Sequence, residues 1–258
     1  MRLYVKYLGI HVKSIMQYKT SFLLTTIGQF LVSFNVFLGM MFMFQRFSNV
    51  EGFTYSECLM CFAIVLLAFS LAECFFRGFD GFAGMIGNGE FDRILVRPKG
   101  LIFQVISSKI ELSRIGRMLQ AIVMFVYAVP RSGINWNFEK IATVFLMIFG
   151  GTIVFAALFI LYAALCFFTL EGLEFMNVFT DGAREYGKYP VNIYGKNVLK
   201  VCTYIVPFAL FQYYPFLYLT GKSEAHYLAL LPLAGCFFLL PCYLLWRLGV
   251  RHYKSTGS

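Results

Sequence analysis

Uninterrupted apolar stretches of about 20 residues constrain this chain more than any other feature. A helix of about that length crosses the hydrocarbon core of a bilayer and satisfies its own backbone hydrogen bonds there. Only 14% of the 258 residues are charged, against about 25% in soluble domains, so a soluble fold has too little polar surface to cover them. We predict an all-α polytopic membrane protein. Its six expected transmembrane helices lie at about 22–44, 53–76, 115–130, 141–168, 198–219 and 227–248.

The first 20 residues form no span but have the pattern of an amphipathic helix. Lys6 and Lys13 fall on one helical face, and Tyr4 and Tyr7 fall on the other. A helix of this kind lies flat in the membrane interface, with its lysines toward the lipid headgroups. We therefore expect an N-terminal interfacial helix and no cleavable signal peptide, because the apolar run that follows is too long for one.

A second amphipathic stretch follows the fourth span, where Glu174 and Asp181 share a helical face. We expect it to form a helix on the cytoplasmic surface that ends near Gly187 and Pro190. The whole chain, 1–258, is expected to be a single membrane domain. Its expected parts are an interfacial helix at 1–20, spans one and two at 22–76, a polar loop at 77–100, spans three and four at 101–168, the amphipathic segment at 171–197, and spans five and six at 198–248.

The distribution of basic residues predicts the orientation. Eighteen lysines and arginines lie in the N-terminal segment, the two long polar loops and the tail, and four lie in the three short loops. Basic residues are retained on the cytoplasmic side, so both termini and both long polar loops are expected in the cytoplasm. The net charge of +9 then reflects contact with anionic membrane lipid rather than with nucleic acid.

The polar loop after the second span is the candidate working surface. Phe79, Phe82 and Ile86 recur at helical spacing, and we expect them to anchor a short helix on a partner protein. Gly87 and Gly89 allow a sharp turn between two short helices. Its charged candidates for pairing with that partner are Glu90, Asp92, Arg93 and Arg97. The alternative is a solvated loop whose charges only fix the topology.

The chain offers no residues for catalysis, for a cofactor or for a metal ion. It has no HExxH or GxSxG motif, and its seven cysteines are an odd number that lies mostly within apolar runs, which favours neither a disulfide framework nor a zinc site. The triplet Gly221-Lys222-Ser223 lacks the earlier glycine of a nucleotide-binding loop, because Phe216 stands there. We expect a protein that is not an enzyme. No charged residue falls at the middle of a span, which disfavours an ion-driven carrier.

Four segments resemble the permease subunits of type-2 ATP-binding-cassette (ABC-2) exporters of bacteria. They are GEFDRILVRP at 89–98, YPVNIYGK at 189–196, IVPFALFQYYPFLYLTG at 205–221 and the tail YKSTG at 253–257. The resemblance implies two permeases, identical or related, bound to two cytoplasmic ATPase subunits that hold ATP and magnesium. It also implies that the loop at 77–100 carries a coupling helix seated in the ATPase. The residues expected at that interface are Phe79, Asp80, Phe82, Ile86, Glu90, Phe91, Asp92, Arg93 and Arg97.

The function that follows is an export permease in the bacterial cell membrane. Because every expected span is apolar and aromatic, we expect an amphipathic or hydrophobic cargo such as a drug, a peptide or a lipid-like molecule. The alternative is a stand-alone channel or secondary carrier without an ATPase partner. A third alternative is a membrane scaffold or sensor that transports nothing.

Overall fold

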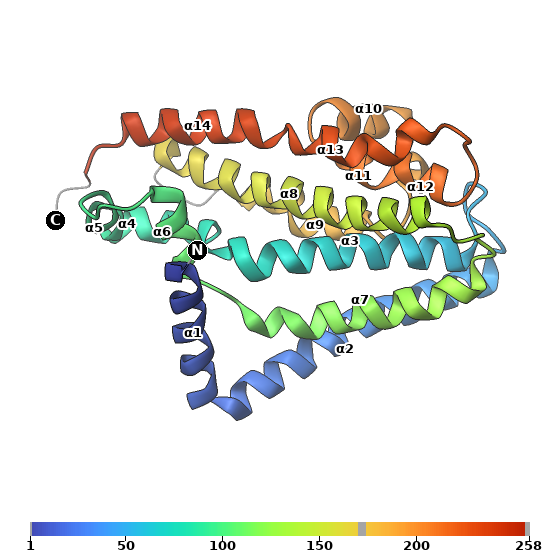
Figure 1. Cartoon of the computed structure of the whole chain (residues 1–258), viewed down its shortest axis with the longest axis horizontal. Helices are drawn as coiled ribbons and strands as arrows, with labels where there is room; N and C mark the ends of the chain where they lie inside the picture. The colour runs from blue at the N-terminus through green and yellow to red at the C-terminus, as the bar shows by residue number, and fades with distance from the viewer. Residues whose placement is uncertain (1, 170–173, 256–258) are drawn as a thin grey trace.

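The computed structural model describes residues 2–169 and 174–255, and every regular element in this part is a helix (Figure 1). Five helices there are long and apolar enough to cross a membrane. Most of the long helices run nearly parallel, whereas α1 (Arg2–Gln17) lies across their direction (Figure 1). The five candidate spans are Lys19–Arg46, Tyr55–Gly87, Leu112–Arg131, Phe138–Thr169 and His226–His252.

The helices of the bundle are joined by several short helices and 3₁₀ turns. The long helices that run along the bundle are α2 (Lys19–Arg46), α3 (Tyr55–Phe76), α7 (Ile115–Ala128), α8 (Phe138–Thr169) and α14 (Leu239–His252). The segment between α3 and α7 contains η1 (Arg77–Phe79), α4 (Phe82–Gly87), α5 (Glu90–Leu95), α6 (Leu101–Ser108) and η2 (Leu112–Arg114). The remaining elements are η3 (Val129–Arg131), η4 (Glu174–Val178), α9 (Asp181–Tyr186), η5 (Val191–Tyr194), α10 (Lys196–Tyr204), α11 (Phe208–Phe211), α12 (Tyr213–Leu219), η6 (His226–Leu230) and α13 (Leu231–Cys236).

Helix α3 is the centre of the bundle and is buried along most of its length between α7 and α8. On the α8 side, the rings of Phe69 and Phe155 meet edge to face with centroids 5.0 Å apart. Its N-terminus is closed by a capping box, in which Glu57 accepts a hydrogen bond from the backbone N–H of Thr54 at 2.8 Å. The second carboxylate oxygen of Glu57 pairs with Lys222 at 2.9 Å, which fixes this end of α3 to the turn after α12.

The predicted fifth span at 198–219 is not one helix. It consists of α10, α11 and α12, none of which is long enough to cross a membrane, so the count of six spans is not confirmed. Pro207 explains the first break, because proline donates no hydrogen bond and cannot continue a helix. The second break falls at Gln212, and Pro215 lies in the first turn of α12, where its missing N–H needs no partner within the helix.

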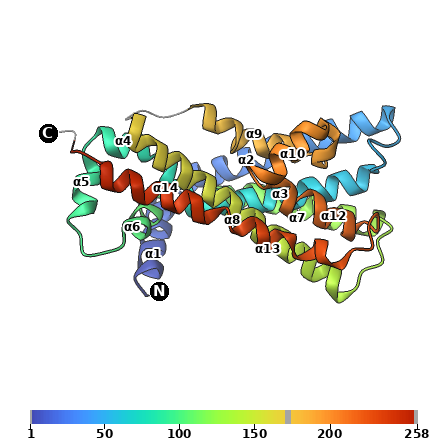
Figure 2. The ribbon, with the colours of Figure 1, turned by 90° about the horizontal axis from the view of Figure 1, so that it is seen from above.

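Part of the segment at 171–197, which we predicted as a helix on the cytoplasmic surface, lies beside α3; residues 170–173 lie outside the described residues. Gly187 ends α9, as predicted, but it is in contact with Val65 at the middle of α3. The Tyr189 hydroxyl donates a hydrogen bond to the Met43 sulfur, near the far end of α2, at 3.1 Å. The close approach of this segment to α3 at Gly187 determines its position. Helices α9 and α10 therefore lie along one side of the bundle (Figure 2).

Candidate functional site

The polar loop after α3 projects from one end of the bundle, beside the C-terminal end of α14 (Figure 1). It contains the two short helices expected from its glycines, α4 and α5. Gly89 between them has φ of +67°, a left-handed conformation that side chains with a Cβ atom disfavour. The prediction of a glycine turn between two short helices is confirmed at this residue.

The apolar residues of this loop face the interior of the chain. Phe79, Phe82, Ile86 and Phe91 are all 0% exposed. No part of these side chains reaches the surface of the chain, although we had expected Phe79, Phe82 and Ile86 to anchor a short helix on a partner protein. Their helical spacing reflects a core that the loop shares with the last helix of the bundle.

That core is an aromatic cluster formed by Phe79, Phe82, Phe91, Phe167, Trp246 and Tyr253. The Phe82 ring lies with its centroid 4.9 Å from that of Trp246 and 5.0 Å from that of Phe167. The Phe91 ring lies 5.0 Å from Tyr253. Edge-to-face aromatic pairs contribute about 0.5–1.5 kcal/mol beyond the burial of their area. The cluster therefore ties α4 and α5 firmly to α8 and α14.

A close approach between two helices makes room for this cluster. Phe167 of α8 packs directly on Gly249 of α14, where a Cβ atom would lie 2.4 Å from the phenylalanine ring. Any larger residue at 249 would push the ring out of place. No local pattern indicates this pairing, because α8 and α14 are far apart in the chain.

The outer surface of the loop combines charge with exposed apolar side chains. Glu90, Arg93 and Arg97 are exposed, as expected for residues that pair with a partner. Two exposed apolar residues were missed by sequence reasoning: Val96, which is 83% exposed, and Leu95, which is 40% exposed. Neither residue lies on the helical face that the buried residues share. An apolar residue off that face is the sequence pattern that would have identified them as exposed. We call Glu90, Arg93, Leu95, Val96 and Arg97 the outer surface of the loop.

Two of the expected interface residues are engaged inside the chain. Asp80 pairs with Arg77, with its Oδ2 3.0 Å from the arginine Nε. Asp92 accepts a hydrogen bond from the Ser255 hydroxyl at 2.8 Å. The carboxylates of these residues hold the loop and the tail in place.

A buried ionic cluster joins the loop to the membrane helices. Glu73, near the end of α3, is 1% exposed and pairs with Arg77 of η1 at 2.5 Å and with Arg117 of α7 at 2.5 Å. Arg114 of η2 lies 3.5 Å from the same carboxylate and 2.7 Å from Glu111. Several charges of both signs can remain buried only because each is paired.

Glu111 lies outside the spans, and its surroundings lower the pKa of its carboxyl group. Burial alone would raise the pKa of this carboxyl, but its hydrogen bond to Lys109 and the charge of Arg114 outweigh burial, and the pKa lies below its ordinary value. The Glu111 backbone N–H also donates to the Cys74 carbonyl at 3.1 Å. This residue therefore connects the start of η2 to the end of α3.

The comparisons with known proteins give one match. A family model described as ABC-2 family transporter protein matches residues 30–257. No curated protein and no solved structure matches the chain. The matched region includes the bundle, the polar loop and the tail. The chain therefore belongs to the ABC-2 family of transporter proteins and is a multi-pass protein of the cell membrane.

Proposed function

We propose that this protein is the permease subunit of an ABC exporter, and that the outer surface of the loop is the contact for a cytoplasmic ATPase. The observation that carries the proposal is Val96, an apolar side chain left 83% exposed beside the exposed Arg93 and Arg97. A central apolar contact within a charged rim is typical of protein interfaces. The ATP and magnesium would be bound by the ATPase.

The proposed orientation places the loop in the cytoplasm. The loop carries Arg93, Arg97 and Lys99, and the nearby ends of α1 and α14 add Lys6 and Arg251. The elements that carry these residues lie toward the same end of the bundle (Figure 1). Basic residues concentrate on the cytoplasmic side of membrane proteins, where an ATPase has access to ATP.

Motion would pass from the ATPase to the spans through two buried connections. The aromatic cluster links α4 and α5 to α8 and α14, and the ion pairs of Glu73 link η1 to α7. Both connections are packed and buried, so they move with the loop instead of bending. Displacement of the loop by closing ATPase subunits would therefore tilt several spans together.

The second permease would pack on the side of the bundle formed by α9 and α10. Lys196 and Lys200 of α10 are exposed there, on a helix that lies beside the bundle rather than beyond its end (Figure 2). A lysine facing lipid tails costs about 2.5–3.5 kcal/mol on insertion scales. A face that carries two exposed lysines is therefore more stable when it packs against a second permease, with an aqueous path between the two permeases, than when it contacts lipid tails.

Co-purification of the ATPase tests this function. Arg93→Glu combined with Val96→Asp should release the ATPase from the solubilised permease, because it reverses one charge and adds another at the contact. Lys13→Glu, an exposed charge reversal on α1, is the matched control and should retain it. If both variants keep the ATPase with full transport, the contact lies elsewhere. Substrate flux in liposomes that contain the permease alone would instead support a channel or carrier.

A further inference from the structure

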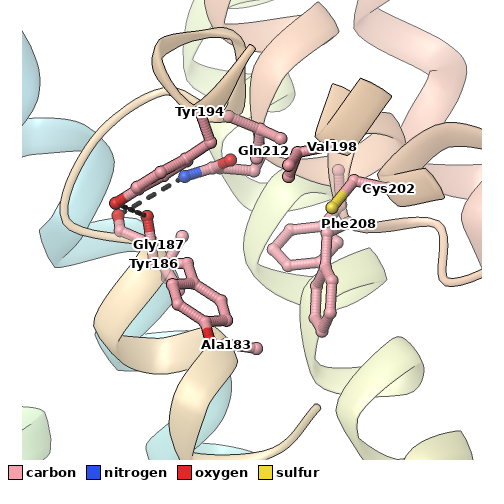
Figure 3. A pocket seen from close by; sticks show the side chains of 11 residues that line it. Ala183, Tyr186, Gly187, Tyr194, Val198, Cys202, Phe208 and Gln212 are labelled. Carbon is pink, nitrogen blue, oxygen red and sulfur yellow. Dashed lines mark hydrogen bonds between the residues drawn. The ribbon is translucent and has the colours of Figure 1, made fainter. Parts of the chain in front are cut away.

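A cavity of about 320 Å³ lies between α9, η5, α10 and α11, against the middle of α3 (Figure 3). Its inner wall is buried and mostly apolar, with Val65 of α3 and the rings of Phe208 and Phe211. Its rim is formed by Tyr186 and Val198, which are 49% and 41% exposed. The cavity therefore opens between α9 and α10, on the side of the bundle that carries the exposed lysines.

The cavity contains one buried polar side chain whose hydrogen bonds are incomplete. Gln212 is 2% exposed, and its Nε2 donates to the carbonyl of Tyr189 at 2.9 Å. It also donates to the carbonyl of Gly187 at 3.4 Å (Figure 3). Two carbonyl acceptors fix the orientation of the amide, since only its nitrogen can donate. The Oε1 atom is then left buried without a partner, although the Cys61 thiol adjoins the same side chain.

An unsatisfied buried acceptor destabilises the fold, so a native structure that retains one can accept a hydrogen bond from a bound molecule. We propose that this cavity binds a small, largely apolar molecule that carries one hydrogen-bond donor, with the donor placed on Gln212 Oε1. The Tyr186 and Tyr194 rings at the mouth, with centroids 5.8 Å apart, provide the aromatic surface for its apolar part. Apolar pockets with one or two placed polar groups are the usual form of small-molecule sites.

This site gives the cargo of the permease a chemical class, and that role rests on the proposed function. The binding of a molecule in the cavity does not rest on the proposed function, because binding needs neither an ATPase nor transport. If the ATPase failed to co-purify, the proposal that the cavity binds a molecule would still stand. If binding in the cavity were not found, the proposed ATPase contact would still stand.

The half-buried Cys202 lines the cavity and provides a direct reporter. The purified permease in phospholipid nanodiscs is treated with N-ethylmaleimide, and mass spectrometry measures the alkylation of each cysteine. The probes are 1-naphthol and 1-methylnaphthalene, which have similar shapes but differ in the hydroxyl donor. We expect 1-naphthol to protect Cys202 at a concentration roughly 2- to 10-fold lower than 1-methylnaphthalene does, as one net hydrogen bond allows. Cys236, which is also half-buried but outside the cavity, should show no protection.

Two variants separate the site from general effects. Val198→Trp fills the mouth and should abolish protection by the probe. Val201→Trp alters an equally exposed residue of α10 that does not line the cavity, and it should behave as the unaltered protein does. Gln212→Leu should remove the difference between the two probes, provided that its thermal unfolding midpoint is unchanged; if it unfolds, the comparison of the two tryptophan variants decides.

Three results would overturn the proposal. The first is equal protection by the two probes in the unaltered protein. The second is equal behaviour of the two tryptophan variants. The third is protection of Cys202 that appears on adding phosphatidylglycerol alone to delipidated protein and that 1-naphthol does not change, since this would assign the cavity to a lipid acyl chain.

Discussion

Phe82 and Trp246 lie with their ring centroids 4.9 Å apart, one in the first short helix of the polar loop and the other in the last helix of the bundle. Both side chains are almost fully buried, at 0% and 2% exposure. The contact makes the loop part of the packed core rather than an appendage. A loop attached in this way cannot be displaced without moving α14.

We predict that Phe82→Ala weakens the link between the ATPase and the spans without removing the ATPase. The substitution leaves a cavity at the centre of the aromatic cluster, and changes of this kind cost about 3–5 kcal/mol in cores. We expect a lower thermal unfolding midpoint, retained co-purification and less cargo moved per ATP hydrolysed. Phe138→Ala is the control, because Phe138 is 85% exposed at the other end of the bundle. Unchanged transport per ATP in Phe82→Ala would contradict the proposed path of motion.

The ion pairs of Glu73 predict an asymmetric response to mutation. Glu73→Gln leaves Arg77 and Arg117 buried without their carboxylate, and breaking a buried pair from one side costs about 3–5 kcal/mol. Adding Arg117→Met should recover part of that loss, because it removes one of the uncompensated charges. The thermal unfolding of both variants measures the effect, with Glu224→Gln as an exposed control. Additive losses in the double variant would show that the two residues are not coupled.

Gly89 and its neighbour Gly87 offer a matched test of the turn. Gly89→Ala must keep φ near +67°, a conformation that costs an alanine roughly 1–2 kcal/mol. Gly87→Ala lies at the end of α4, has no atoms within 4 Å of its added methyl group, and should be neutral or stabilising. Thermal unfolding should therefore fall only for Gly89→Ala. Equal midpoints for the two variants would contradict the turn.

Glu111 predicts a contribution to stability that depends on pH. Its pKa lies below the ordinary value in the folded chain, because Lys109 and Arg114 outweigh the effect of burial. A lowered pKa stabilises the fold above the unfolded-state value, and this stabilisation is lost as the pH falls through the folded-state value. The unfolding midpoint of the unaltered protein should therefore drop more between pH 5 and pH 3 (~2 units that begin just above the ordinary glutamate pKa of about 4.3 and extend below it) than that of Glu111→Gln. Parallel curves would contradict this assignment.

Much of the bundle could be predicted because lipid and helix geometry leave few choices. The apolar runs located α2, α3, α7 and α8. The predicted fifth span is instead three short helices, with one break before Pro207 and another at Gln212. At the second break, the Gln212 side chain donates hydrogen bonds to the carbonyls of Tyr189 and Gly187, which are contacts that no local pattern contains.

The candidate site shows the same limit. The spacing of Phe79, Phe82 and Ile86 correctly indicated one apolar face, but it did not say what that face covers. The structure assigns it to Trp246 and Phe167, which are distant in sequence. Charged residues at 171–197 indicated a water-exposed helix, whereas close approach to α3 holds part of that segment along the side of the bundle. In both cases a tertiary contact determined the outcome.

Site-specific photo-crosslinking from position 96 tests the central claim most directly. A benzoylphenylalanine in place of Val96 in the assembled complex should form a covalent adduct that mass spectrometry identifies as an ATPase subunit. The same group in place of Ile10, which is 61% exposed on α1, should form none. An adduct with an ATPase from position 96 alone is the predicted result, and adducts only with lipid or with the permease itself would contradict the account.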